Sequence, residues 1–154
     1  LAGTGGVLEA GLAGVDGGEC CTAAGNPWAA YGPSLSAPTS LRRPFLAGDY
    51  GAWAEARRVA LAGALVRALD TRVEALAANG EVELALTHAR EAVRMEPYRE
   101  SGYRRLMRMQ VRSGDRGEAI RSYLECKRLL AAELGVGPSE EPESLYRERA
   151  GQAV

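Results

Sequence analysis

The sequence predicts an all-α protein built from helical hairpins, and three observations lead to this fold class. From Leu41 to about Leu134 the composition is dominated by Ala, Leu, Arg and Glu, which are strong helix formers. Apolar residues in this region recur every three or four positions, as they do on one face of an amphipathic helix. Two successive helix pairs match each other at a shift of 34 residues. No alternating run is long enough to predict a sheet.

The first two predicted helices are separated by Asn79-Gly80. The apolar residues of the first are mostly four apart and share one face: Trp53, Leu61, Leu65, Leu69, Val73 and Leu76. Glycine adopts the left-handed conformation that closes a helix, so Gly80 should end it. The second helix spans about 81–96.

Pro97 favours the start of a third helix, because its missing N–H would have no partner in a first turn. This helix ends at Ser113-Gly114, and a fourth runs over about 116–134 until Gly135 stops it. A short terminal helix is expected over 141–150, with Leu145 and Tyr146 facing inward.

The repeat relates five pairs of positions. At a shift of 34 residues, Asn79 matches Ser113, Gly80 matches Gly114, Ala85 matches Ala119, Leu86 matches Ile120 and Ala92 matches Cys126. Thirty-four residues is the period of tetratricopeptide (TPR) repeats, which place small residues where paired helices cross closely. We therefore expect two TPR-like hairpins plus a C-terminal helix, with Ala85 and Ala119 at the crossings. An ordinary antiparallel helical bundle is the alternative.

Residues 1–40 differ from the rest of the chain. They contain nine glycines, three prolines and no Lys or Arg. We find no helical or strand period in them, and glycine makes ordering the backbone costly. We expect an irregular or disordered Gly-rich leader over 1–40 and one helical domain over 41–150. Gly3-Thr4-Gly5-Gly6 lacks the Gly-Lys-Ser/Thr ending of a phosphate-binding loop.

Charge and cysteine content narrow the function classes. The formal net charge is -1, so no overall positive field draws the chain to DNA or to a membrane. We expect neither a spanning helix nor a signal peptide. Three cysteines, two of them adjacent at Cys20 and Cys21, do not make a disulfide framework, which favours the cytoplasm.

Several segments resemble a known family. The most specific is Glu-Pro-Tyr-Arg-Glu-Ser-Gly-Tyr-Arg-Arg-Leu-Met at 96–107, followed by related segments at 118–123 and 129–136. Upstream, Arg-Pro-Phe-Leu-Ala-Gly at 43–48 precedes Trp53. Together they closely resemble the bacterial transcriptional activator domain, the TPR-like region of regulators of the antibiotic-regulatory-protein type. The resemblance implies a domain that follows a winged-helix DNA-binding domain and modulates its DNA binding, its self-association or its contact with the transcription machinery.

The residues do not predict catalysis or a bound cofactor. His88 is the only histidine, and no other His or Cys lies three or four residues from it, as a metal site on a helix would require. No nucleophile with a neighbouring base can be assembled from the sequence. We expect a non-enzymatic protein without catalytic residues, cofactor or metal.

The candidate site is instead a surface for a partner. Arg104, Arg105, Arg108 and Arg112 recur every one to four positions on the third helix, opposite its apolar side. They form either a solvated face or a docking stripe for an acidic partner or for phosphates. We expect the helix face from Trp53 to Leu69 to be apolar. A second copy of the chain or another domain should cover this face.

Three functions remain open. The first is an effector or interaction domain of a transcriptional regulator, which meets DNA only through a separate winged-helix domain. The second is a free-standing TPR adaptor for a peptide or protein partner, and the third is a helical domain attached to an enzyme. In each, the expected partner is a protein or a second copy of the chain, and not a membrane.

Overall fold

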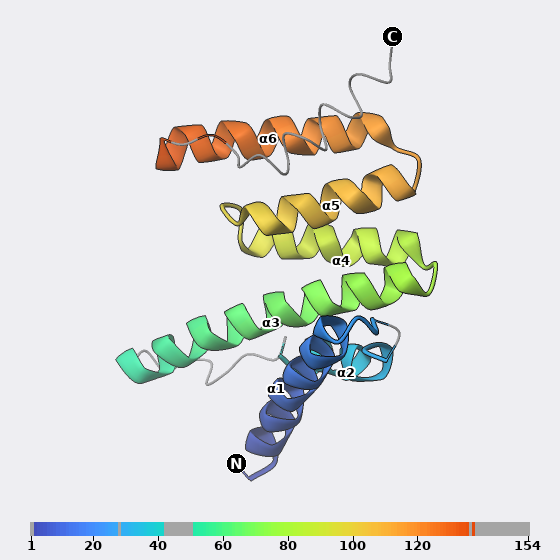
Figure 1. The fold of residues 1–154 in the computed structure, drawn as a ribbon. Coiled ribbons are helices and arrows are strands. Elements are labelled where there is room, and N and C mark those ends of the chain that lie inside the picture. The colour runs from blue at the N-terminus through green and yellow to red at the C-terminus, as the bar shows by residue number, and fades with distance from the viewer. Residues whose placement is uncertain (1, 28, 42–50, 136, 138–154) are drawn as a thin grey trace. The chain divides into compact units, whose positions relative to one another are not determined.

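The computed structural model describes residues 2–27, 29–41, 51–135 and 137, and these residues form six α-helices (Figure 1). In chain order they are α1 (Ala2–Ala23), α2 (Tyr31–Leu41), α3 (Ala52–Ala78), α4 (Val82–Met95), α5 (Glu100–Arg112) and α6 (Arg116–Leu134). No strand occurs in this part of the chain. The predicted all-α class of helical hairpins is confirmed. The terminal helix expected over 141–150 lies outside the described residues.

The chain forms two compact units, 1–80 and 81–154. In the first unit, α1 and α2 pack against each other and both pack against α3. In the second, α4 packs against α5, and α5 packs against α6. Each unit therefore has its own set of helix–helix contacts.

The first unit depends on a close approach between α1 and α3. A methyl group built on Gly18 would lie 2.7 Å from Cγ2 of Thr71, closer than a real side-chain contact allows. One residue along, the Arg67 Nε of α3 lies 3.1 Å from Oε1 of Glu19. Gly18 and Thr71 are both buried, so the backbone of α1 lies directly against the Thr71 side chain of α3.

The helical residues 2–23 and 31–41 correct the expectation of an irregular leader. Gly11, Val15 and Gly18 of α1 are buried at the spacing of one helix face. Glycine contributes no apolar side chain to a periodicity, so this face is invisible to a search for hydrophobic spacing. Packing against α3 offsets the entropic cost of ordering the glycines.

A glycine turn ends α1 in the same way as it ends the later helices. Gly25 has a positive φ of 74°, its N–H donates to the Thr22 carbonyl, and the Asn26 N–H donates to the Cys21 carbonyl. This pair of hydrogen bonds is the Schellman motif. The Asn26 side chain then accepts a hydrogen bond from the Ala29 N–H at 3.2 Å. Gly-Asn-Pro at 25–27 was therefore a helix-end signal within the supposed leader.

The apolar face of α3 is covered for most of the range that we expected to be exposed. Leu61, Leu65 and Leu69 are all buried, and α1 and α2 both pack on α3. Only the first turns differ, where Trp53 and Val59 are 61% and 65% exposed. The expectation of an uncovered face from Trp53 to Leu69 is therefore wrong from Leu61 onward. The residues of the supposed leader form the helices that cover this part of α3.

In the second unit, α5 and α6 share two core clusters. Tyr103 packs with Cys126 and Leu130, and the partly buried Val93 and Leu129 lie against them. Met107 packs with Ala119 and Tyr123, and Val111 lies against these. Ala119 therefore lies at the contact between α5 and α6, as the repeat predicts. Ala85 on α4 is fully buried, and its crossing with the preceding helix stays a prediction.

The predicted helix ends are also present. Gly80, Gly114 and Gly135 follow α3, α5 and α6 with positive φ angles of 82°, 89° and 66°. At the end of α5, the Gly114 N–H donates to the Val111 carbonyl and the Asp115 N–H donates to the Gln110 carbonyl. This is again a Schellman motif, and it turns the chain from α5 into α6.

We predict that Gly18→Ala destabilises the first unit. The new methyl group would lie 2.7 Å from the Thr71 Cγ2, and the β-branched Thr71 side chain is buried and stiff. The expected loss is about 1–3 kcal/mol in the free energy of unfolding, measured by urea titration followed by circular dichroism. Thr71→Ser removes the methyl group that would clash, so it should restore part of the stability lost in Gly18→Ala.

Gly17→Ala is the matched control for this prediction. Gly17 neighbours Gly18 on α1, is exposed, and has no atom within 4 Å of an added methyl group. Because alanine favours a helix over glycine by about 0.5–1 kcal/mol, this variant should be as stable as the parent or more stable. Equal midpoints for Gly17→Ala and Gly18→Ala would contradict the close crossing of α1 and α3.

We also predict that Ala119→Leu overpacks the α5–α6 contact. Ala119 is 4% exposed and lies among Met107 and Tyr123, so a larger side chain has no free space. The expected destabilisation is about 1–3 kcal/mol by urea titration. Ala131→Leu on the exposed side of α6 is the control, and it should change stability by no more than about 0.5 kcal/mol. An unchanged midpoint and slope for Ala119→Leu would argue against the repeat assignment.

Candidate interaction surface

The four arginines of the predicted site share one side of α5, which we call the arginine face (Arg104, Arg105, Arg108 and Arg112). At 3.6 residues per turn they fall within an arc of about 100° around the helix axis. Arg108 and Arg112 are exposed, whereas Arg104 and Arg105 are half-buried. The opposite side of α5 carries its buried residues, Gly102, Tyr103, Leu106, Met107, Met109 and Gln110.

The burial of α5 fixes the direction of the arginine face. Tyr103 and Met107 are held in the two core clusters shared with α6. On the side of α4, a methyl group built on Gly102 would lie 3.4 Å from Cγ2 of Val93, so the two helices approach closely there. With both neighbours in contact, α5 has little freedom to rotate about its axis. The arginines are therefore presented by a supported helix and not by a loop.

The loop between α4 and α5 is organised by Arg99. Its Nε lies 2.9 Å from Oε2 of Glu96, and its Nη1 donates to the Ser101 hydroxyl at 3.3 Å. The Ser101 carbonyl in turn accepts a hydrogen bond of 3.5 Å from Nη1 of Arg105. The polar residues of the 96–107 signature thus connect the end of α4 to the first turn of α5, which gives them a structural role.

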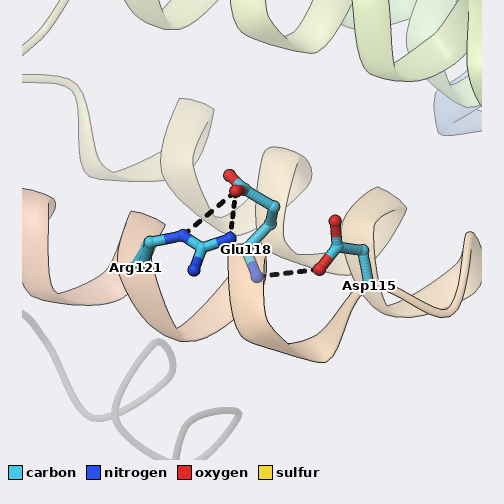
Figure 2. A network of polar contacts seen from close by, with 3 residues as sticks. All are labelled: Asp115, Glu118 and Arg121. Atoms are coloured by element: carbon cyan, nitrogen blue, oxygen red, sulfur yellow. Dashed lines mark hydrogen bonds and ion pairs between the residues drawn. The ribbon is translucent and has the colours of Figure 1, made fainter.

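A second polar network begins α6 (Figure 2). The Asp115 side chain caps the helix by accepting a hydrogen bond of 3.0 Å from the Glu118 N–H. The Glu118 carboxylate accepts from Nε of Arg121 at 3.0 Å and pairs with its Nη2 as well. Capping by Asp typically contributes about 1 kcal/mol, and an acid in the first turn is also favoured by the helix dipole. These contacts lie within α6 and its cap.

Trp53, the other predicted site residue, lies on α3 in the first unit and is 61% exposed. Nearby, Arg58 donates from Nη1 to Oε2 of Glu55 at 3.1 Å, one turn apart on the same helix. The structure thus groups the four arginines on one helix, and it places Trp53 on a different helix in the other unit. Whether Trp53 and the arginine face meet a common partner stays a hypothesis.

Sequence reasoning missed several exposed apolar residues. Leu84, Met95, Tyr98 and Leu124 are between 37% and 51% exposed. Leu84 and Met95 belong to α4, Tyr98 follows its end, and Leu124 belongs to α6. At 100° per residue, Leu124 lies well away from the buried Ala119, Tyr123 and Leu130 around the axis of α6. Its exposure therefore agrees with its position on the helix.

Two titratable side chains in the α5–α6 core are kept neutral. Burial, together with the nearby carboxylates of Glu100 and Glu125, raises the pKa of Cys126 from 9.0 to about 11. Burial also raises the pKa of Tyr103 from 10.0 to about 12. Both folded-state pKa values lie above the unfolded values. The contribution of the two protonated groups to the stability of the fold is therefore fully present below about pH 9. It is lost as the pH rises through about 11 and 12.

The part of the chain that the structure describes contains neither a metal-binding cluster nor a membrane-spanning helix. No group of three or more His, Cys, Asp or Glu residues there could hold a metal ion. His88 is half-buried, and its Nδ1 lies 3.7 Å from Oε2 of Glu91. None of the described helices combines the length and the apolar character that crossing a bilayer requires.

The cysteines supply a direct test of the α5–α6 core. At pH 8 a disulfide reagent should modify Cys20 and Cys21 quickly, because Cys20 is exposed and Cys21 is partly exposed. Cys126 is 1% exposed and protonated, so it should react only when the protein unfolds. A Cys20→Ser/Cys21→Ser variant should show no fast phase. Rapid modification of one thiol in that variant would contradict the buried Cys126.

Comparison with known proteins agrees with the resemblance found in the sequence. The family model of the bacterial transcriptional activator domain matches residues 10–148. The match begins within α1, so it includes residues that we had placed in the leader. Regulatory protein AfsR of Streptomyces coelicolor is 36% identical over 93 residues, which cover 60% of this chain and 9% of that protein. This chain belongs to the bacterial transcriptional activator domain family.

Proposed function

We propose that the chain is a protein-interaction or effector domain of a bacterial transcriptional regulator, which modulates the DNA binding or the assembly of a winged-helix domain. The observation that carries this proposal is the family match over residues 10–148. The similar regulatory protein from Streptomyces coelicolor is much longer, since the matched segment covers 9% of it. A domain of this kind acts through the other parts of such a regulator.

The chemistry of the described residues supports binding over catalysis. Cys126 is buried with a raised pKa, which opposes formation of the nucleophilic thiolate. Asp115, Glu118 and Arg121 form a helix cap and an ion pair on α6. These three polar side chains therefore have structural roles. A non-enzymatic function in the cytoplasm, where bacterial transcription takes place, follows from this proposal.

The charges favour an indirect relation to DNA. The formal net charge is -1, whereas a DNA-binding domain needs an excess of Lys and Arg to replace the counterions of the phosphates. The arginine face is a local positive patch on a chain whose total charge is nearly balanced. We therefore assign DNA recognition to a separate winged-helix domain and protein contacts to this chain.

Trp53 is the strongest apolar candidate for such a contact. Its side chain is 61% exposed at the beginning of α3. Burial of apolar surface contributes about 25 cal/mol per Å², so covering an indole ring gives one of the larger contributions that one residue can make. The expected partner is a second copy of the chain or the winged-helix domain.

A free-standing TPR adaptor is the second candidate. It is favoured by the exposed Leu84 and Tyr98 on and beside α4, since exposed apolar side chains are also what a peptide-binding helical repeat would present. The two candidates differ in whether residues 1–154 affect DNA binding by another part of the same polypeptide.

The proposal is tested with the regulator whose gene encodes these residues in frame with a winged-helix domain. Operator affinity is measured by fluorescence anisotropy, and the state of assembly by sedimentation velocity. The parent is compared with a deletion of 1–154 and with Trp53→Ser. The deletion should change operator affinity, assembly or both, and Trp53→Ser should weaken assembly in the same direction. Gly17→Ala, on an exposed part of α1, should behave as the parent.

Two results would contradict this function. One is the absence of any winged-helix domain in the same polypeptide, which would favour the adaptor. The other is a deletion variant that binds operator DNA and assembles in the same way as the parent.

A further inference from the structure

Two free thiols stand next to each other near the end of α1. Cys20 is exposed and Cys21 is partly exposed, whereas the third cysteine, Cys126, is buried in the α5–α6 core. The proposed regulatory function gives the adjacent pair no role. Two thiols within reach of one solvent molecule are nevertheless a pair of strong ligands for soft elements.

The backbone that carries the pair is held in helical form on both sides. Before it, Gly18 is buried in the close crossing of α1 with α3. After it, the Ala24 N–H donates to the Cys20 carbonyl at 3.0 Å. The Asn26 N–H donates to the Cys21 carbonyl, also at 3.0 Å, as part of the Schellman motif that ends the helix. The thiols are therefore presented by a capped helix end.

This backbone opposes a disulfide between the two neighbours. Their Cα atoms are about 3.8 Å apart across the peptide bond, whereas disulfides usually join Cα atoms at least about 4.4 Å apart. On a helix the two side chains also leave the axis about 100° apart. An internal disulfide would require the end of α1 to leave the helical form. While the helix persists, Cys20 and Cys21 stay separate thiols.

An atom that bridges the two sulfurs relaxes this constraint. With bonds to sulfur of about 2.3 Å, the length of a zinc–thiolate bond, it holds the sulfurs roughly 3–4.5 Å apart instead of about 2 Å. Rotation of each side chain about its Cα–Cβ bond can then close the ring while the backbone stays helical.

The number of ligands decides which element suits the pair. A structural zinc ion takes four protein ligands, and the described residues hold no group of three or more His, Cys, Asp or Glu that could bind a metal ion. Trivalent arsenic that carries one organic group needs two thiols and no further protein ligand. It is a soft element, and thiolate is a soft ligand.

We infer that Cys20 and Cys21 together form a dithiol site for trivalent arsenic. An arsenical of the form R–As=O loses its oxygen as water, which takes up the two thiol protons. Two As–S bonds form, one to each cysteine, and the As=O bond breaks. Arsenic stays trivalent, and no oxidant or reductant is needed. The inference goes beyond the proposed function, because it gives the first unit a small-molecule ligand.

Binding of phenylarsine oxide to the full, reduced chain tests the inference. Intact mass spectrometry under native conditions should show one phenylarsine group per chain. The bound group should block modification of Cys20 and Cys21 by a disulfide reagent. Excess glutathione, a monothiol, should not remove the group. Dithiothreitol should remove it, because this dithiol replaces both cysteines at once.

Variants distinguish a chelate from two separate thiols. Cys20→Ser and Cys21→Ser should each weaken binding by about 100-fold or more, because the second thiol of a linked pair binds at a high effective concentration. Adding Gly17→Cys to Cys21→Ser should recover most of the lost affinity. Positions 17 and 20 are both exposed and lie three residues apart on one side of the helix, and a side chain at 17 meets no atom within 4 Å.

Three results would overturn the inference. They are single variants that bind as tightly as the parent, release by glutathione as complete as release by dithiothreitol, and a parent that binds phenylarsine oxide only in urea. The first two would leave two ordinary thiols, and the third would assign the arsenical to Cys126 exposed by unfolding. The experiment involves neither operator DNA nor a winged-helix domain, so its failure is distinguishable from failure of the regulator experiment.

Discussion

Close approach of helices through small residues is the constraint on which this structure depends. Gly18 brings α1 against the Thr71 side chain, and Gly102 brings α5 against Val93. Ala119 has the same role between α5 and α6. A short interaxial distance lets the larger side chains on either side interdigitate at the density of a protein interior. The glycines cost helix propensity, and the packing that they permit offsets this cost.

The packing of α5 also explains why its charges can act together. Its buried side is specified by Tyr103, Leu106 and Met107, and the arginine face is what remains on the opposite side. Because one helix sets both sides, a change that rotated α5 would move the whole row of arginines at once. The Schellman turn at Gly114 and the Asp115 cap fix where α5 ends and α6 begins. The core therefore determines the geometry of the surface.

The sequence predicted those parts of the fold that have local signals. Gly80, Gly114 and Gly135 each end a helix where expected, because left-handed backbone favours glycine whatever the tertiary structure. Residues 2–23 were missed for the opposite reason. Their buried face is made largely of glycine, so hydropathy carries no period, and the only local signal is the helix end at 25–27. The missed helices also explain why most of the α3 face is covered.

For the candidate site, the sequence predicted which residues share one side of α5. It did not predict how exposed each of their side chains is. Helical periodicity placed four arginines on one side of α5, and the structure agrees. It did not separate the exposed Arg108 and Arg112 from the half-buried Arg104 and Arg105, because that difference depends on neighbouring helices. Periodicity reports the angle of a residue around its own helix, whereas exposure depends on what lies opposite.

The exposed residues of the two units are of two kinds, which contribute differently to binding. Exposed apolar residues such as Trp53 and Tyr98 can supply affinity, because covering them removes apolar area from water. Exposed arginines supply less affinity, since each exposed ion pair typically contributes about 0.2–1 kcal/mol, and such charges act mainly on association rate and specificity. On the proposed function, the exposed apolar groups would therefore set how tightly a partner binds, and the charged groups how selectively.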